Sequence, residues 1–128
     1  MYEFQIKKMK ENGQMKKWAN KTFDEIQIGD IFYVSGGYEM TIVTFYKVVG
    51  KRGKSTLEVV RLANRFVEQY EVGRGKVVPD ESKVTGGPFK VRCTIDGYDG
   101  SIRFLEPEYG YEHAYLWDGE PRHYNDYD

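Results

Sequence analysis

Residues 28–62 decide the fold, and they read Ile28-Gly-Asp-Ile-Phe-Tyr-Val34, Ser35-Gly-Gly-Tyr-Glu-Met40, Thr41-Ile-Val-Thr-Phe-Tyr-Lys-Val-Val49, Gly50-Lys-Arg-Gly-Lys54 and Ser55-Thr-Leu-Glu-Val-Val-Arg-Leu62. β-Branched and aromatic residues fill three runs, and segments that contain glycine separate them. This order predicts a strand, a loop, a second strand, a tight hairpin turn and a third strand. Residues 41–49 are apolar or aromatic on both faces, which is typical of a central strand covered on both sides.

A second hairpin is expected further along the chain. Residues 89–95 alternate strictly between apolar and polar, and residues 101–105 return after a turn at 96–100. Together the two hairpins predict one β-barrel, whose buried core contains Ile31, Tyr33, Val43, Phe45, Val48, Leu57, Val59, Val91 and Ile102.

At 128 residues the chain fits one domain with one core. We divide it into an N-terminal hairpin or helical turn (residues 1–25), a β-barrel (26–105) and a tail rich in acids and tyrosine (106–128). A turn at Gly29-Asp30 followed by an apolar strand is typical of the start of a small SH3-like barrel. The predicted fold is therefore mainly all-β: a small SH3-like, partly open antiparallel barrel with an N-terminal hairpin and an extended C-terminal segment. We expect that segment to pack over the barrel through its aromatic residues, which are Tyr109, Tyr111, Tyr115, Trp117, Tyr124 and Tyr127.

The sequence favours a cytoplasmic protein without a membrane segment. No apolar run approaches the roughly 20 residues that cross a bilayer. The first ten residues carry three lysines and lack the apolar region of a secretory signal. Cys93 is the one cysteine, which excludes an internal disulfide and suits a reducing compartment.

The net charge of −1 hides an uneven distribution along the chain. Residues 1–95 hold 17 Lys and Arg against 11 Asp and Glu, which gives +6, whereas residues 96–128 hold two against nine, which gives −7. Such a split can indicate nucleic-acid binding or an acidic contact surface. The alternative is that the two ends neutralise one another in the fold or are simply solvated.

Residue patterns give no support for catalysis or metal binding. The segment Gly73-Arg-Gly-Lys76 is too short for a phosphate-binding loop, and no strand-to-helix elbow follows Ser35. His113 and His123 lie near acids, but their spacing matches no zinc pattern. We therefore expect no enzymatic activity, no cofactor and no metal site.

Two stretches of the chain, residues 26–62 and 111–127, resemble a set of small proteins encoded by bacteriophages, plasmids and integrative elements of bacteria. In that set a loop tends to read Ser-Trp-Gly-Tyr-Asp-Gln-Thr, with Phe-Tyr-Gln-Val-Val a few residues later, and the chain closes on Trp-Asp-Gly-Lys-Pro. The matching segments here are Gly29-Asp-Ile-Phe-Tyr33, Gly37-Tyr-Glu-Met-Thr41, Phe45-Tyr-Lys-Val-Val49 and His113-Ala-Tyr-Leu-Trp-Asp-Gly-Glu-Pro121. This chain differs from the set in having Gly36 in place of Trp and Met40 in place of Gln.

The resemblance implies a mobile-element setting in a bacterial host cell and an SH3-like β fold. Small proteins from that setting often counter host defences, including CRISPR systems. The first hypothesis is therefore a non-catalytic inhibitor that binds a host protein, for example a nucleic-acid-binding defence effector, with acids placed where nucleic acid would lie. Its expected contact residues are Asp96, Asp99, Glu106, Glu108, Glu112, Asp118, Glu120 and Tyr38.

The alternative hypothesis is direct binding of DNA or RNA by the basic N-terminal half. Ammonium and guanidinium groups would neutralise phosphates, and an aromatic ring would stack on a base. The residues expected to make these contacts are Lys16, Lys17, Trp18, Arg52 and Lys54.

Overall fold

The computed structural model describes residues 21–36 and 41–125. These residues form seven strands and one short 3-10 turn, η2 (Phe23–Glu25). The strands are β1 (Ile31–Gly36), β2 (Ile42–Arg52), β3 (Thr56–Glu71), β4 (Arg74–Ile95), β5 (Ile102–Leu105), β6 (His113–Leu116) and β7 (Arg122–Asn125). No α-helix occurs in the described residues, and thus none there that is long and apolar enough to span a membrane.

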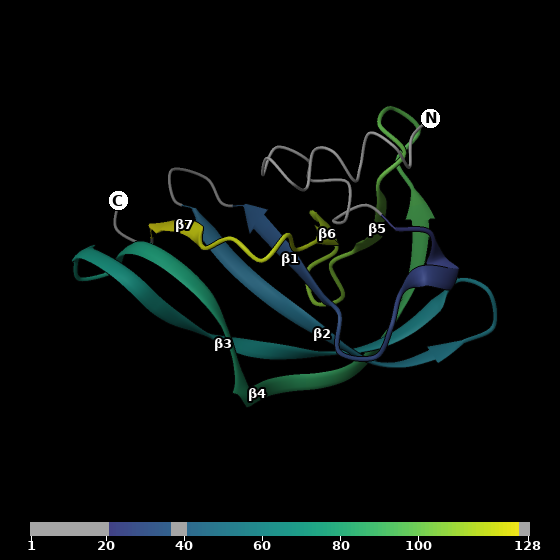
Figure 1. Cartoon of the computed structure of the whole chain (residues 1–128), viewed down its shortest axis with the longest axis horizontal. Helices are drawn as coiled ribbons and strands as arrows, with labels where there is room; N and C mark the ends of the chain where they lie inside the picture. Colours follow the sequence, from purple (N-terminus) through teal and green to yellow (C-terminus); the bar gives the residue numbers. More distant parts are fainter. Residues whose placement is uncertain (1–20, 37–40, 126–128) are drawn as a thin grey trace, which may run out of the picture.

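The seven strands form one antiparallel sheet, six of whose strands close into a ring (Figure 1). The order is β3-β2-β1-β6-β5-β4, and a further pairing of β3 with β4 closes the circle, while β7 adds to β4 outside it. This confirms the all-β antiparallel prediction. The ring is not a regular barrel, because β3 and β4 run on beyond it as a long hairpin with several register shifts.

Strand β2 is covered on both faces, and each face carries its own hydrophobic cluster. Tyr46 and Val48 point into the ring, where every one of the six strands contributes to an inner core that also holds Phe32 and Phe104. Val43 and Phe45 point the other way, into an outer core. This core is covered by β7 and by the hairpin of residues 63–71 of β3 and 74–80 of β4, which we call the distal hairpin. The other buried residues of the outer core are Ile31, Val60, Leu62 and Val77.

The expectation of a single core in one barrel is therefore wrong. Eight of the nine predicted core residues are buried, but Ile31, Val43 and Phe45 belong to the outer core and the other five to the inner core. Tyr33 is only partly buried and packs at the margin of the outer core. The physical reason is that alternate side chains of a strand point to opposite faces, so a strand with apolar residues on both faces needs cover on both sides.

The C-terminal segment is part of the sheet and not only a cover for it. Strand β6 lies between β1 and β5, with Tyr33 opposite Tyr115 and Phe104 opposite Ala114, so the ring closes only through the tail. Strand β7 pairs with residues 74–77 of β4, and a bridge between Thr41 and Asn125 ties it to the start of β2. The tail's aromatic residues are divided, because Trp117 packs on Phe45 whereas others are exposed.

Residues 1–20 lie outside the described part of the chain, so the predicted N-terminal hairpin is not addressed. At the end of the segment predicted as a hairpin or helical turn, the 3-10 turn η2 is present, and the backbone N–H of Thr22 donates to Oε1 of Glu25 at 2.9 Å. Ile26 follows and enters one end of the inner core. Lys51 fixes this end, because its ammonium group donates to the carbonyl oxygen of Ile26 at 2.8 Å and lies over the ring of Phe23.

Truncation of Phe45 tests the outer core. Phe45 is fully buried and meets Trp117 edge-on, with 5.4 Å between ring centroids. We expect Phe45→Ala to lower the free energy of unfolding by about 3–5 kcal/mol, through lost burial and the cavity left behind. Urea denaturation measures the change. Val72→Ala, at a position 88% exposed, is the control and should change stability by less than about 0.5 kcal/mol. Equal small effects of both variants would contradict the two-sided burial of β2.

Candidate functional site

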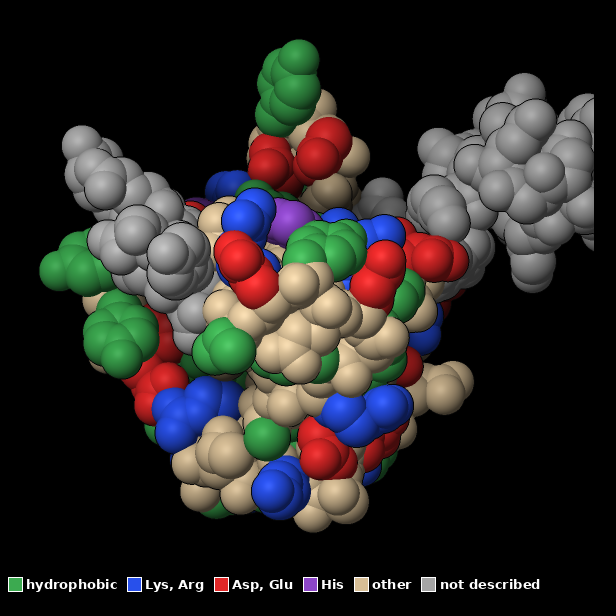
Figure 2. All heavy atoms as spheres, turned by 90° about the vertical axis from the view of Figure 1, so that its left-hand side faces the viewer, with side chains coloured by type: hydrophobic (Ala, Val, Ile, Leu, Met, Phe, Trp, Pro, Cys, Tyr) green, Lys and Arg blue, Asp and Glu red, His purple; other side chains and the backbone are tan. Residues whose placement is uncertain are grey.

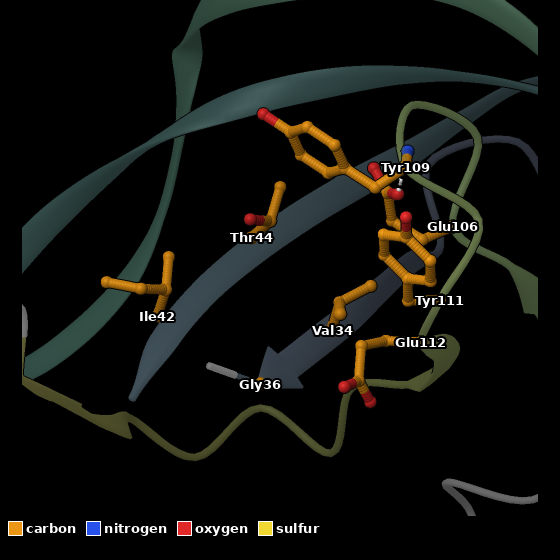
Figure 3. A pocket seen from close by; sticks show the side chains of 8 residues that line it. All are labelled: Val34, Gly36, Ile42, Thr44, Glu106, Tyr109, Tyr111 and Glu112. Atoms are coloured by element: carbon orange, nitrogen blue, oxygen red, sulfur yellow. Dashed lines mark hydrogen bonds between the residues drawn. The ribbon is translucent and has the colours of Figure 1, made fainter. Parts of the chain in front are cut away.

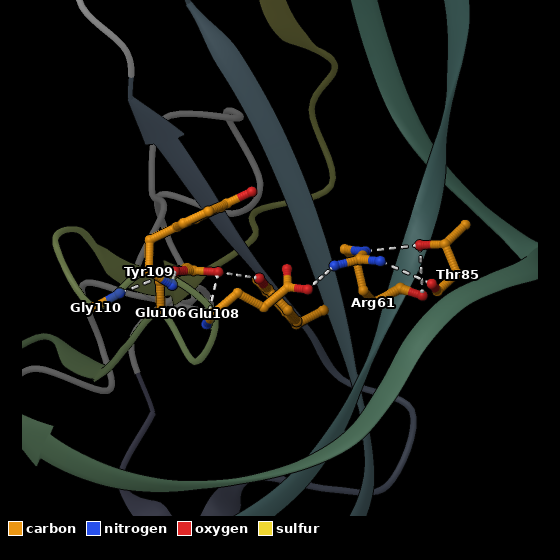
Figure 4. Close-up of polar contacts among 7 residues, drawn as sticks. Arg61, Thr85, Glu106, Glu108, Tyr109 and Gly110 are labelled. Carbon is orange, nitrogen blue, oxygen red and sulfur yellow. Dashed lines mark hydrogen bonds and ion pairs between the residues drawn. The ribbon is translucent and has the colours of Figure 1, made fainter.

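A buried carboxylate organises the loop between β5 and β6. Glu106 is 6% exposed, and its oxygens accept four hydrogen bonds (Figure 4). Oε2 accepts from the hydroxyl of Tyr46 at 2.7 Å and from the backbone N–H of Glu108 at 3.1 Å. Oε1 accepts from the backbone N–H of Tyr109 at 2.6 Å and of Gly110 at 3.2 Å. The loop is thereby fastened to β2, in the middle of the ring.

These hydrogen bonds keep Glu106 ionised in spite of its position. Burial by itself raises the pKa of the carboxyl group, but the hydrogen bonds from Tyr109, Tyr46, Glu108 and Gly110 outweigh it and hold the pKa below its ordinary value. The pKa of the Tyr46 hydroxyl is raised, first by burial and then by its hydrogen bond to Glu106. The pair therefore consists of a carboxylate and a neutral phenol that donates to it.

Arg61 of β3 links the same loop to the other side of the ring. Its guanidinium group forms an ion pair with Glu108 and donates to the carbonyl oxygen of Thr85 in β4 at 2.7 Å and to the hydroxyl oxygen of Thr85 at 2.9 Å (Figure 4). The hydrogen bond to Glu108, more than any other contact, raises the pKa of Arg61. Since Glu108 neutralises Arg61, the charge of Glu106 has no cation of its own among the contacts described above.

A cavity of about 310 Å³ lies beside this network, and we call it the mouth pocket (Figure 3). Val34 and Thr44 come from neighbouring strands of the ring and share the inward-facing side with Phe32 and Tyr46. The full lining is Val34, Gly36, Ile42, Thr44, Glu106, Tyr109, Tyr111 and Glu112. None of these residues is basic, so the lining combines apolar and aromatic groups with two acids.

Two tyrosines of the fastened loop stand at the rim of the mouth pocket. Tyr109 is 77% exposed and Tyr111 is 85% exposed, although both line the cavity. Figure 3 shows that the ring of Tyr109 lies near Thr44 and that the ring of Tyr111 lies near Val34 and Glu106. The expectation that these tail tyrosines pack over the barrel is wrong. The loop's own hydrogen bonds to Glu106 hold its backbone, so the rings are not needed to anchor it.

Four of the predicted contact acids are held by ion pairs or buried hydrogen bonds of the fold. Glu106 and Glu108 belong to the network described above. Asp96 pairs with Arg103 at 3.0 Å, and Asp118 pairs with Arg122 at 3.3 Å. These four carboxylates are therefore used in contacts within the fold.

The remaining predicted acids lie on three different segments. Glu112 lines the mouth pocket and its side chain lies against Gly36, where an added Cβ would be 3.0 Å from the carboxyl carbon. Asp99 is exposed on the turn between β4 and β5 and accepts a hydrogen bond from the backbone N–H of Ser101. Glu120 is exposed on the connection between β6 and β7. The structure thus brings Glu106, Glu108 and Glu112 together, but it does not join all seven acids into one surface. Tyr38 lies outside the described residues.

The basic residues of the alternative hypothesis meet further cations in the sheet. Arg52 and Lys54 are exposed at the hairpin between β2 and β3, and Arg52 pairs with Glu58 at 3.0 Å. Thr56 lies between Arg52 and Arg92 in the register, and Lys90 is the register partner of Glu58. We call Arg52, Lys54, Lys90 and Arg92 the basic face. The strict alternation of residues 89–95 could have identified the last two, since it places them opposite the buried Val91. Lys16, Lys17 and Trp18 lie outside the described residues.

The end of the molecule that carries the distal hairpin and β7 has no single sign of charge. Figure 2 shows acidic and basic side chains interspersed over this face. Arg74 pairs with Glu71 at 2.9 Å, and Lys76 lies 3.8 Å from Glu68. In this region the opposite charges of the chain neutralise one another locally.

Cys93 has the position expected of a structural strand residue. It is buried in the inner core, and burial raises the pKa of its thiol to about 11. Over residues 21–36 and 41–125, no group of three or more His, Cys, Asp and Glu side chains is arranged to hold a metal ion. The ring of His113 lies near that of Tyr115 and the ring of His123 near that of Tyr70, in tilted pairs with centroid distances of 6.5 and 6.4 Å.

Comparison with known proteins finds no match for this chain. No protein-family model matches the chain. No significant match is found among curated proteins. The same holds for the solved structures.

Substitution of Glu106 by Gln tests the buried network. One end of the new amide is an NH₂ group, so at least one of the backbone N–H donors of the loop loses its acceptor. We expect Glu106→Gln to lower the free energy of unfolding by about 1–3 kcal/mol at pH 7. Because the pKa of Glu106 is lower in the folded state, its stabilisation is complete above the unfolded value of about 4.3 and is lost as the pH falls through the folded pKa.

The measurement is urea denaturation of both proteins at pH 7 and at pH 3. The difference between wild type and Glu106→Gln should be largest at pH 7 and smaller at pH 3. Glu81→Gln is the matched control, because Glu81 is exposed and forms only a surface ion pair with Lys47 at 3.3 Å. A wild type and a Glu106→Gln variant of equal stability at pH 7 would show that the carboxylate does not hold the loop.

Proposed function

We propose that this protein is a non-catalytic inhibitor that acts by binding another protein through the mouth pocket and its tyrosine rim. The observation that carries the proposal is the pair of exposed tyrosines, Tyr109 and Tyr111, beside a cavity of about 310 Å³. Tyrosine is enriched at protein interfaces and at the residues that dominate their affinity, because it buries a large area at a small entropic cost.

The attachment of the loop supports this role. Three backbone N–H groups of the loop, at residues 108–110, donate to Glu106, and the hydroxyl of Tyr46 fastens Glu106 itself to β2. A loop that is ordered before binding loses less conformational entropy when the partner arrives. Glu106 and Glu108 therefore act as supports for the contact surface. Glu106 also lines the pocket, but it is buried, whereas Glu112 is the exposed acid of the pocket lining.

The biological setting of the proposal rests on sequence resemblance alone. The loop around Gly37-Tyr-Glu-Met-Thr41 and the segment Trp117-Asp-Gly-Glu-Pro121 resemble small SH3-like proteins of bacterial mobile elements. On that basis the proposed partner is a protein of a host defence system, such as a nucleic-acid-binding effector of CRISPR-Cas, and the proposed site of action is the bacterial cytoplasm. Classification of the ring as SH3-like belongs to the same proposal.

Removal of the tyrosine rings tests the proposed contact. We expect the double variant Tyr109→Ala/Tyr111→Ala to lose capture of a protein that the wild type retains from nuclease-treated lysate of the bacterial host. The retained protein is identified by mass spectrometry, purified and titrated against both forms. Loss of two central aromatic anchors should weaken the dissociation constant at least about thirtyfold.

The matched control is Tyr98→Ala. Tyr98 is 97% exposed on the turn between β4 and β5, and it does not line the mouth pocket. This variant should bind the partner as the wild type does, and all three proteins should have the same melting temperature. Undiminished binding by the rim variant, or equal losses in both variants, would contradict a contact centred on the mouth pocket.

A second candidate function is nucleic-acid binding by the basic face. The specific observation is that the sheet aligns Arg52 with Arg92, two strands apart, and places Lys90 beside them. Neighbouring strands are about 4.8 Å apart, so the two guanidinium groups project from positions separated by about 10 Å on one face. Glu58 offsets part of this charge through its ion pair with Arg52. Such a row is suited to phosphates of a nucleic-acid strand.

Charge removal on the basic face tests this candidate. If nucleic acid binds there, Lys90→Gln/Arg92→Gln should weaken binding of a fluorescent single-stranded oligonucleotide and reduce the slope of log K against log salt by about one to two units. The control Arg74→Gln/Lys76→Gln removes the same charge from the distal hairpin and should leave both quantities unchanged. Absence of oligonucleotide binding by the wild type at physiological salt, or equal losses in both variants, would exclude the basic face as a nucleic-acid-binding site.

A further inference from the structure

The mouth pocket carries negative charge that its own residues do not neutralise. The carboxylate of Glu112 forms no ion pair or side-chain hydrogen bond with the part of the chain that the structure describes. Glu106 is ionised and is held by three backbone N–H groups and one phenol, which are neutral donors. The nearby cation, Arg61, is paired with Glu108. A ligand that fits this site should therefore be positively charged.

The other walls of the pocket restrict the kind of cation. Val34 and Ile42 supply aliphatic surface, and the rings of Tyr109 and Tyr111 stand at the rim (Figure 3). A cavity of about 310 Å³ lies at the small end of the range for ligand sites, which begins at about 300 Å³. It is matched to one long side chain with an apolar stem and a charged end. A compact hydrated ion would leave the aliphatic wall without a contact.

The two acids have different roles toward such a ligand. Each oxygen of Glu106 already accepts two hydrogen bonds, which fills the positions that a carboxylate oxygen offers. Glu106 therefore contributes its charge but no further acceptor. Glu112 keeps both oxygens available, and its exposed side chain lies across the end of β1 against Gly36. Direct hydrogen bonds to the ligand are left to Glu112.

We propose that the mouth pocket receives an arginine side chain of the partner protein, with its guanidinium group on Glu112 and its stem along Val34 and Ile42. Arginine fits better than lysine, because a planar guanidinium binds a carboxylate through two parallel hydrogen bonds and stacks on aromatic rings, and because it is more weakly hydrated. This inference rests on the proposed function, since it names the group by which the partner is recognised.

The test uses capped tripeptides as probes and amide chemical shifts of the full-length protein as the readout. Acetyl-Gly-Arg-Gly-amide should shift amides of residues 34–36, 41–44 and 106–112. The citrulline peptide has the same shape without the charge and should bind at least about tenfold more weakly. The lysine peptide should bind at least about threefold more weakly than the arginine peptide, because an ammonium group lacks the planar pair of donors of a guanidinium.

The variant Glu112→Gln should bind the arginine peptide at least about fivefold more weakly than the wild type. Asp99→Asn, which changes an exposed acid on another turn, should bind it as the wild type does. The proposal would be overturned if the arginine and citrulline peptides bind equally, if the shifts are confined to other residues, or if Glu112→Gln binds the arginine peptide as tightly as the wild type. The two proposals fail separately. Capture of a partner that depends on Tyr109 and Tyr111, without binding of the arginine peptide, overturns only the arginine inference. Pocket binding of the arginine peptide with no rim-dependent partner overturns the proposed function.

Discussion

The rest of the structure depends on the cover that β2 receives on both faces. Apart from Thr44 and Lys47, its residues from Ile42 to Val48 are apolar or aromatic and divide between the two faces, so a single core on one side would leave those of the other face in water. The fold meets this constraint in two ways. Five other strands close a ring around Tyr46 and Val48, and the distal hairpin with β7 returns over Val43 and Phe45. The ring and the outer core therefore both follow from the apolar residues on the two faces of β2.

Ring closure brings a carboxylate into the interior, where Glu106 meets a hydroxyl 60 residues away in the chain. A charge in that position is tolerated because four donors surround it, and the donors include consecutive backbone groups of its own loop. The loop is consequently ordered by polar contacts rather than by burial of its side chains. Tyr109 and Tyr111 are free to face solvent, which turns a connection between two short strands into a candidate contact surface.

The two candidate functions use separate parts of the sheet. The mouth pocket lies on the inward side of β1 and β2 and is acidic, whereas the residues of the basic face come from β2, β4 and the hairpin turn between β2 and β3. Occupation of one does not compete with the other in space. An inhibitor that docks an arginine of a nucleic-acid-binding protein in the pocket would match the electrostatic pattern of such partners, whose own surfaces are basic.

The sequence by itself determined the strands of residues 31–62 and the hairpin at 89–105, because their alternation and turn residues are local signals. It also identified most buried positions. Only the tertiary structure decided that those positions divide into two cores, that β6 completes the ring, and that Glu106 is buried while Tyr111 is exposed. These outcomes depend on which distant strands pair. A carboxylate in a tyrosine-rich tail has the appearance of a surface group until the fold places Tyr46 beside it, and that contact arises from ring closure, which no local pattern encodes.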